Sequence, residues 1–525
     1  MSTILKPTFP QISDRRWAVL IGLAVFAVFS YQIFLPWFPT YDSGVYLELA
    51  RSLIHGGGYR YMGYIHNKYP PIFPLLLSPF FLISAHPIAA IRFFLVLVAA
   101  GSLSVTFLLF KEKETPYRGL LTALWFSLTP PLIYYSALVL SDVCYTAFSL
   151  SAFLMLKRWR NGHERKYLIG LALALCLSVL TRIIGFVLPA AILLSSFIDK
   201  SNNKIEPERL LRGIAVGALL VISLWQIRSV LVPPSAVMPP KLGDSHSYTN
   251  ELLVKNRFQP DQPMIGLSVI IGRLKMNVPF YIRKVIPMSL GWYHLRRYHP
   301  GWILFPLLLL GFYRKPRNAE EIHLVLYMSI LLNWPTPQGT RYLLPVIPFL
   351  IDYLIEGITC AAGFFRKLEF YKKKWFRVTA LSVSVVIGGI YTYFLIIEAW
   401  NTHRWNTTGG FLAYENHFYF RQNILWAKKH LPKDTVLMSD RSSSTYHLSG
   451  LKTYPVRTAD LHELLETIDK YRISYLITSR ITGYGTPLNK AARDHPDLFQ
   501  PVMENRWSGI YAVSRSGLSK ITGEI

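Results

Sequence analysis

Residues 17–37 read WAVLIGLAVFAVFSYQIFLPW and are followed, after Phe38, by Pro39-Thr-Tyr-Asp-Ser-Gly-Val-Tyr46. An apolar run of about 20 residues is long enough to cross the hydrocarbon core of a bilayer as one helix. This run is too long for the apolar core of a signal peptide, and no small-residue cleavage site precedes Asp42, so it is predicted to remain as a membrane anchor. Asp42 therefore marks the point at which the chain leaves the membrane.

The rest of the chain repeats this pattern. Hydrophobic residues make up 51% of the 525 residues, and the mean hydropathy is +0.28. The apolar sequence comes in runs of about 15 to 25 residues separated by charged stretches, which is more than one soluble core requires. The composition predicts an α-helical protein that crosses a membrane many times.

The orientation follows from the positive charge, because loops rich in Lys and Arg stay in the cytoplasm. Lys6, Arg15 and Arg16 precede the first run, and basic clusters recur near residues 111–113, 157–166, 200–212, 314–317 and 366–374. Placing every cluster inside predicts about eleven spans. They are 17–37, 88–110, 117–138, 142–157, 167–182, 183–198, 213–232, 300–313, 321–334, 341–360 and 377–399.

Two long segments then lie on the outer side, 38–87 and 233–300. The first contains an amphipathic helix from about Val45 and a short apolar run at 72–83. That run is interrupted by prolines, and counting it as a span would invert every later loop, so it is predicted to be interfacial or re-entrant. Within the second segment, residues 264–290 combine apolar and basic residues and predict a helix in the headgroup plane.

The two parts of the chain differ in character. Residues 1–400 form the predicted membrane domain, and residues 401–525 predict a small extracytoplasmic α/β domain. The expected helices are 415–430 and 459–471, and the expected strands are 435–439, 474–478 and 509–514. No glycine-rich phosphate loop follows a strand, which argues against a nucleotide site there.

Charge and cysteine content narrow the function classes. The formal net charge is +26, which in a soluble protein would suggest nucleic acid. Here the excess follows the inner loops, so we expect no nucleic-acid partner and an attraction to anionic lipids instead. Cys144, Cys176 and Cys360 all fall within predicted spans, so no disulfide framework is implied.

Five short motifs carry a resemblance to a known family. In chain order they are Tyr41-Asp-Ser-Gly-Val-Tyr46, Lys68-Tyr-Pro-Pro71, Ser141-Asp142, Thr181-Arg-Ile-Ile-Gly185 and Thr340-Arg-Tyr-Leu-Leu-Pro-Val-Ile-Pro348. Together they resemble the GT-C glycosyltransferases, in the branch of the protein O-mannosyltransferases and lipid A aminoarabinose transferases. The resemblance covers residues 14 to about 400, and the C-terminal part is similar to the extracytoplasmic domain of many bacterial members.

The resemblance implies transfer of a sugar from a polyprenyl-phosphate donor to an acceptor at the outer face of the membrane. Asp42 would act as the general base on the acceptor hydroxyl. Lys68, Arg182 and Arg341 would bind the donor phosphate and stabilise its developing charge. Structural readings compete with these roles, since Asp42 is also suited to cap a helix and the three cations to anchor span ends.

Further residues share this face and are predicted to bind the acceptor or support the site: Glu48, Tyr46, Tyr69, Asp142, Tyr342 and His66. Glu48 is also placed to pair with Arg51 on a solvated helix face. His55 and His66 lie in the same loop as Asp42, but they lack a tight ligand spacing. We therefore expect no metal site and no obligatory cofactor.

The sequence leaves the substrates and some function classes open. The acceptor could be a glycolipid, a cell-envelope polysaccharide or a protein hydroxyl, and the oligomeric state is not indicated. A glycan polymerase or ligase is the nearest alternative, and a lipid or glycolipid transporter is the alternative from another class. A transporter should show repeated halves or mid-membrane charges. The expected location is the bacterial inner membrane, with the N-terminus in the cytoplasm.

Overall fold

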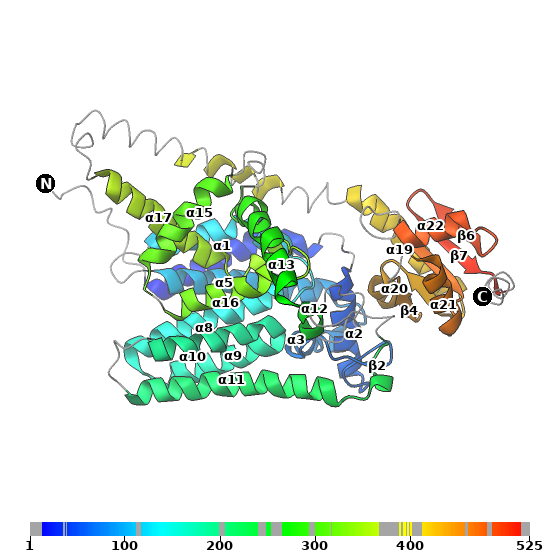
Figure 1. Cartoon of the computed structure of the whole chain (residues 1–525), viewed down its shortest axis with the longest axis horizontal. Coiled ribbons are helices and arrows are strands. Elements are labelled where there is room, and N and C mark those ends of the chain that lie inside the picture. The colour runs from blue at the N-terminus through cyan, green and yellow to red at the C-terminus, as the bar shows by residue number, and fades with distance from the viewer. Residues whose placement is uncertain are drawn as a thin grey trace.

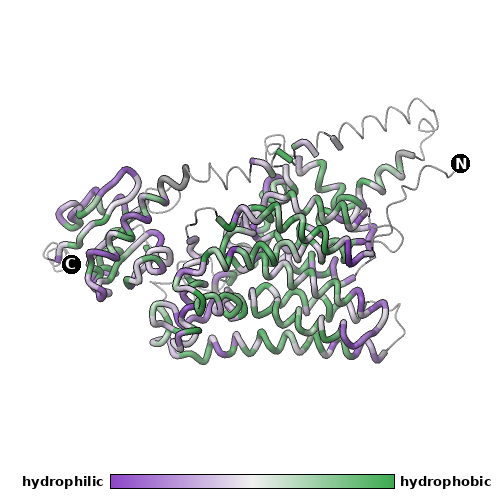
Figure 2. The backbone as a smooth tube through the Cα atoms, turned by 180° about the vertical axis from the view of Figure 1, so that it is seen from behind, coloured by the Kyte–Doolittle hydropathy of each residue, from purple (hydrophilic) through white to green (hydrophobic). Residues whose placement is uncertain are grey.

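The computed structural model describes residues 13–34, 37, 39–111, 117–198, 205–239, 248–253, 265–292, 300–316, 318–366, 412–456, 460–479 and 486–515, with short helical pieces between 388 and 401. Helices form the main body, and a smaller unit with a sheet lies at one end of it (Figure 1). Hydrophobic residues cover the helical bundle, whereas hydrophilic residues concentrate at its ends and in the smaller unit (Figure 2). The molecule thus has the hydropathy pattern of a multi-pass membrane protein.

The helices of the bundle follow the predicted spans. They are α1 Asp14–Phe29 with the 3-10 turn Ser30–Phe34, α5 Ile88–Phe110, α6 Tyr117–Ser127, α7 Pro130–Tyr135, α8 Asp142–Gly162, α9 Arg165–Thr181, the 3-10 turn Ile183–Phe186 with α10 Val187–Ile198, α11 Ile205–Leu231, α15 Gly301–Arg314, α16 Ala319–Leu332, and the 3-10 turn Thr340–Leu343 with α17 Ile347–Arg366. Four helices of the described part are long and apolar enough to cross a membrane by length and composition: Asp14–Phe34, Ile88–Phe110, Glu206–Leu231 and Ile347–Phe364. The span predicted at 377–399 lies largely outside the described residues.

One predicted span differs from a single helix. Residues 117–138 form α6 and α7, because Pro130 and Pro131 cannot continue the hydrogen bonding of α6 and instead begin a new helix. The chain then turns into α8, which starts at Asp142. This break places the start of α8 at the same end of the bundle as the end of α9.

The segment after the first span is built around α2, Tyr41–Ile54. Thr40 is the N-cap of α2, since its hydroxyl accepts a hydrogen bond from the Ser43 amide, so the helix starts four residues before Val45 and holds Asp42 in its first turn. The hairpin of β1 Arg60–Tyr61 and β2 Tyr64–Ile65 follows. The predicted helix at 72–83 is split into α3 Ile72–Leu77 and α4 Phe80–Ile83, with Pro79 between them.

The second long segment contributes helices that pack against the bundle. They are α12 Tyr248–Leu253, α13 Leu267–Phe280 and α14 Ile286–Ser289, and a π-helical turn, Tyr281–Val285, joins the last two. The segment 264–290, which was expected to be a helix, is therefore largely helical, with an irregular turn at 281–285. Pro279 lies just before that turn and removes one backbone donor from the helix.

The C-terminal unit is a five-stranded sheet with helices. Its strands are β3 Leu437–Ser439, β4 Thr453–Pro455, β5 Tyr475–Ser479, β6 Phe499–Asn505 and β7 Ser508–Val513, in the order β4-β3-β5-β7-β6. The parallel strands β4, β3 and β5 continue into the antiparallel pair β7 and β6. Its helices are α19 Leu412–His430, α20 Ser442–Ser449, α21 Leu461–Lys470 and α22 Thr486–Asp494.

Candidate active site

Asp42 is held by two side chains from distant parts of the chain. The Tyr69 hydroxyl donates to Oδ1 at 2.8 Å, and Nη1 of Arg341 donates to Oδ2 at 2.6 Å. Burial alone would raise the pKa of Asp42, but the charge and hydrogen bond of Arg341 and the hydrogen bond of Tyr69 outweigh it and lower the pKa below its usual value. The carboxylate is therefore ionised and fixed in orientation.

Asp142 joins both arginines of the site. It lies in the first turn of α8, where Oδ1 accepts from Nη1 of Arg182 at 2.5 Å and Oδ2 accepts from Nε of Arg341 at 2.7 Å. The side chain of Asp142 is only 3% exposed. A continuous chain of alternating charges thus runs from Asp42 through Arg341 and Asp142 to Arg182. The four residues come from four separate elements.

Each arginine keeps donors for a further ligand. Arg182 uses Nη1 for Asp142 and Ser141, and Arg341 uses Nε and Nη1 for its two carboxylates. Among the described residues, Nε and Nη2 of Arg182 and Nη2 of Arg341 have no hydrogen-bond partner. The guanidinium groups also lie 5.3 Å and 5.6 Å from the centre of the Tyr342 ring. Both guanidinium groups are thus within cation–π distance of one ring, and their remaining donors are left for an anion.

Lys68 is paired with a residue that the sequence did not indicate. Its Nζ lies 2.6 Å from Oε1 of Glu251 and 5.1 Å from the centre of the Tyr248 ring, both on α12. The sequence around α12 has no periodic hydrophobic pattern, so neither Tyr248 nor Glu251 was predicted as a site residue. The signal that could have indicated them is the spacing of an aromatic residue and a carboxylate at i and i+3, which places both on one face of a helix. The pair ties α12 to the loop that carries Tyr69.

The other predicted residues support this arrangement or lie apart from it. The Tyr46 hydroxyl lies 3.1 Å from the Ser141 hydroxyl, and Nε2 of His66 accepts from the Tyr69 amide at 3.1 Å. Glu48 pairs with Arg51 at 2.9 Å, as the spacing predicts. Glu48 is nevertheless buried rather than solvated, because His447 of α20 lies 2.6 Å from the same carboxylate oxygen.

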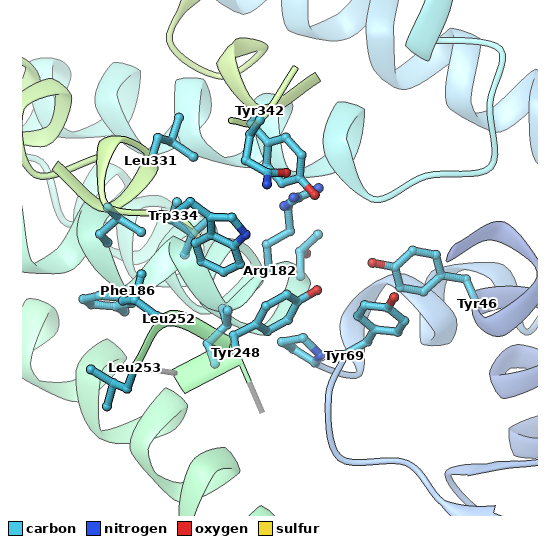
Figure 3. A pocket seen from close by; sticks show the side chains of 16 residues that line it. Tyr46, Tyr69, Arg182, Phe186, Tyr248, Leu252, Leu253, Leu331, Trp334 and Tyr342 are labelled. Atoms are coloured by element: carbon cyan, nitrogen blue, oxygen red, sulfur yellow. The ribbon is translucent and has the colours of Figure 1, made fainter. Parts of the chain in front are cut away.

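A cavity of about 300 Å³ opens beside these charges. Figure 3 shows its polar side, where the hydroxyl groups of Tyr46 and Tyr69 lie close together and the guanidinium of Arg182 lies beside Tyr342. Its apolar side is formed by Phe186, Leu252 and Leu253. Trp334 and Tyr248 lie between the two sides, and Leu331 also lines the cavity. The cavity therefore suits a ligand with an anionic end and a long apolar end.

Metal ligands are not gathered at this site in the part of the chain that the structure describes. No group of three or more His, Cys, Asp or Glu residues with ligand geometry occurs there. His55 is the C-cap of α2 and lies at the opposite end of that helix from Asp42. The positive group that contacts Asp42 is the guanidinium of Arg341.

A family model matches part of the chain. Residues 68–227 match the family described as dolichyl-phosphate-mannose-protein mannosyltransferase. These residues include Lys68, Tyr69, Asp142 and Arg182. No curated protein matches the sequence.

Solved structures match over nearly the whole chain. ArnT from Cupriavidus metallidurans bound to undecaprenyl phosphate is 13% identical, with a TM-score of 0.58 over 96% of this chain and 99% of that one. The archaeal oligosaccharyltransferase AglB from Archaeoglobus fulgidus, in complex with an inhibitory peptide and a dolichol-phosphate, is 13% identical, with a TM-score of 0.53 over 96% and 75%. The Archaeoglobus fulgidus oligosaccharyltransferase in complex with Zn and sulfate is 14% identical, with a TM-score of 0.56 over 96% of this chain and 73% of that one.

These matches confirm the resemblance that the five sequence motifs indicated. The likeness to ArnT includes the C-terminal unit, because it covers almost the full length of both chains. The chain therefore has the fold of these solved structures, and residues 68–227 carry the match to the mannosyltransferase family.

Proposed function

We propose that this protein transfers a sugar from a polyprenyl-phosphate donor to the hydroxyl group of an acceptor at the outer face of the membrane. The observation that carries the proposal is the position of Asp42, held between Tyr69 and Arg341 beside a cavity with a basic end and an apolar wall. A glycosyl phosphate on a long isoprenoid chain has matching parts. ArnT and AglB were each solved with a polyprenyl phosphate, which supports the same ligand class here.

The reaction follows from these groups. The acceptor oxygen attacks the anomeric carbon while the bond from that carbon to the phosphate oxygen breaks, and the electron pair leaves with the phosphate. Asp42 accepts the proton of the acceptor hydroxyl. Attack from the face opposite to the phosphate inverts the anomeric carbon. The products are the glycosylated acceptor and the polyprenyl phosphate.

Fixed cations stabilise the leaving phosphate. Arg182 lines the basic end of the cavity, and Arg341 is joined to Arg182 through Asp142. Lys68 is held by Glu251. Charge-assisted hydrogen bonds to phosphate oxygens strengthen as the bond breaks, because negative charge then builds up on the phosphate. These side chains supply positive charge where a glycosyltransferase needs it.

Lys68→Ala is expected to weaken donor binding by about 10- to 150-fold, the equivalent of one charged hydrogen bond of roughly 1.5–3 kcal/mol. The measurement is a titration of the purified protein with a polyprenyl-phosphate sugar. The double variant Lys68→Ala/Glu251→Ala leaves no unpaired carboxylate and should bind as weakly as the single variant. Lys275→Ala removes an exposed lysine of α13 and should bind normally. Wild-type affinity in Lys68→Ala would limit Lys68 to tying down α12.

The same proposal requires the C-terminal unit and Asp42 to face the same side of the membrane. In a variant without Cys144, Cys176 and Cys360, single cysteines at the exposed positions Arg60, Glu466 and Asn161 can be tested on intact cells with a membrane-impermeant thiol reagent. We expect labelling at 60 and 466 and protection at 161, which lies at the basic C-terminal end of α8. Labelling at 161 with protection at 60 would place the site in the cytoplasm and contradict the proposal.

A further inference from the structure

Helix α2 has two functional faces. Asp42 and Tyr46 are one turn apart and face the charged groups of the site. Gly44, Glu48 and Arg51 recur at intervals of four and three residues, so they share another face about half a turn away. The first face is held by Tyr69 and Arg341, which leaves the question of what holds the second.

Helix α20 of the C-terminal unit packs on that second face, and Figure 1 shows the two helices side by side. At Gly44 the approach is so close that an added Cβ atom would lie 2.7 Å from the Ser443 carbonyl oxygen. The Ser444 hydroxyl donates to the Pro39 carbonyl at 2.8 Å, just before the N-cap of α2. The backbone of α20 thus lies directly on the turn that carries Asp42.

One buried polar contact continues this interface along α2. Nδ1 of His447 lies 2.6 Å from Oε1 of Glu48, and Nη1 of Arg51 donates to the same oxygen at 2.9 Å. Glu48 and His447 are 9% and 8% exposed, respectively. A buried carboxylate is costly unless it is paired, so this contact favours one relative position of the two helices.

Two further contacts fix the orientation of the C-terminal unit on the hairpin that follows α2. The Tyr64 hydroxyl of β2 lies 3.2 Å from the Tyr454 hydroxyl of β4. The Tyr61 ring packs edge-on against the Tyr446 ring of α20, with 5.6 Å between their centres. Contacts at both places prevent α20 from turning about the Glu48–His447 contact alone.

We propose that α20 is a positioning element of the transfer reaction, and that Glu48 and His447 are positioning residues that hold Asp42 at the distance the acceptor requires. This inference rests on the proposed function of Asp42. Neither residue touches Asp42; both act through the backbone of α2. The C-terminal unit would therefore contribute directly to the rate of sugar transfer, although it supplies no group to the reacting atoms.

The expected effect is on the rate of the transfer step and not on donor affinity, because Lys68, Arg182 and Arg341 lie outside the α2–α20 interface. A displacement of about 1 Å at a catalytic group can cost as much as 100-fold in rate. We expect His447→Ala and Glu48→Gln each to lower the single-turnover rate about tenfold, within that limit. Donor affinity should stay within about twofold of wild type, since fixed cations on other elements determine it.

The test is a double-mutant cycle in the full-length protein. His447→Ala, Glu48→Gln and the double variant are compared in donor affinity and single-turnover rate. The double variant should be no slower than the slower single variant, because both substitutions remove the same contact. His447→Asn places an amide nitrogen near the position of Nδ1 and should recover most of the rate. His462→Ala changes an exposed histidine of α21 that pairs within its own helix and should behave as wild type.

Two results would overturn the inference: wild-type rates in both single variants, or independent effects that multiply in the double variant. Gly44→Ala provides a separate measurement, since the added methyl group would push α20 away. Normal donor affinity in this variant shows that the bundle is folded. A normal transfer rate together with normal affinity would also contradict the inference. Asp42→Asn distinguishes the two proposals. If Asp42→Asn is inactive while His447→Ala is normal, only the role of α20 fails. If Asp42→Asn is active, the proposed function fails as well.

Discussion

Asp42→Asn is expected to lower the rate of sugar transfer by about 10² to 10⁴, the usual contribution of a general base. The amide keeps the size of the side chain and can still accept a hydrogen bond from Tyr69, so donor binding should change little. It cannot accept the proton of the acceptor hydroxyl. The measurement is a single-turnover assay with purified protein and a saturating concentration of polyprenyl-phosphate sugar.

The matched control is Asp434→Asn, which neutralises an exposed carboxylate of the C-terminal unit. It should turn over at the wild-type rate. A near-normal rate for Asp42→Asn would reduce Asp42 to a structural partner of Arg341.

Arg341→Ala is expected to have the second large effect, because Arg341 contacts both Asp42 and Asp142 and has a donor available for the phosphate. Two charged hydrogen bonds of roughly 1.5–3 kcal/mol each correspond to a combined loss of about 10² to 10⁴ in catalytic efficiency. Arg341→Lys should recover only part of this loss, since an ammonium group cannot contact two carboxylates in the same planar geometry.

Stability must be measured for the same variants. Removing one partner of a buried ion pair typically costs about 3–5 kcal/mol, so Arg341→Ala should also unfold more easily. Arg60→Ala changes an exposed arginine of the β1–β2 hairpin and should leave both activity and stability unchanged. Wild-type donor affinity and turnover in a folded Arg341→Ala variant would limit Arg341 to a structural role between Asp42 and Asp142.

The parts of the fold that depend on local pattern were accessible from the sequence. Long apolar runs bounded by basic clusters predicted helices such as α5 and α11, because length and hydropathy alone decide a membrane helix. Asp42, Arg182 and Arg341 were predicted site residues because each lies at a predicted outer boundary of a span and within a motif that carries the family resemblance. The structure brings these three together with Asp142, which links the two arginines.

The parts that depend on long-range contact were not accessible. Asp142 was given only a supporting role, since nothing near it in the sequence shows that Arg182 and Arg341 both reach it. Glu251 lies in a stretch with no helical periodicity, so its pairing with Lys68 could not be foreseen. The contact between Glu48 and His447 joins residues 399 positions apart, and α20 itself is a short polar helix with no hydrophobic period.

The C-terminal sheet shows the same limit. The buried strands β3, β5 and β7 were predicted within one or two residues, because their apolar runs are clear. The edge strands β4 and β6 were missed. β4 has three residues, and β6 has exposed residues, a proline at Pro501 and an irregular register after it, all of which weaken a strand pattern.

The most direct measurement combines lipid and glycan analysis in cells that lack this protein. If it transfers sugar from a polyprenyl phosphate, one polyprenyl-phosphate sugar should accumulate while the same sugar disappears from one glycan, glycolipid or glycoprotein. Wild-type protein should restore both, and Asp42→Asn, present at the same level, should restore neither. Unchanged lipid-linked sugars and glycans, or full restoration by Asp42→Asn, would contradict sugar transfer by this site.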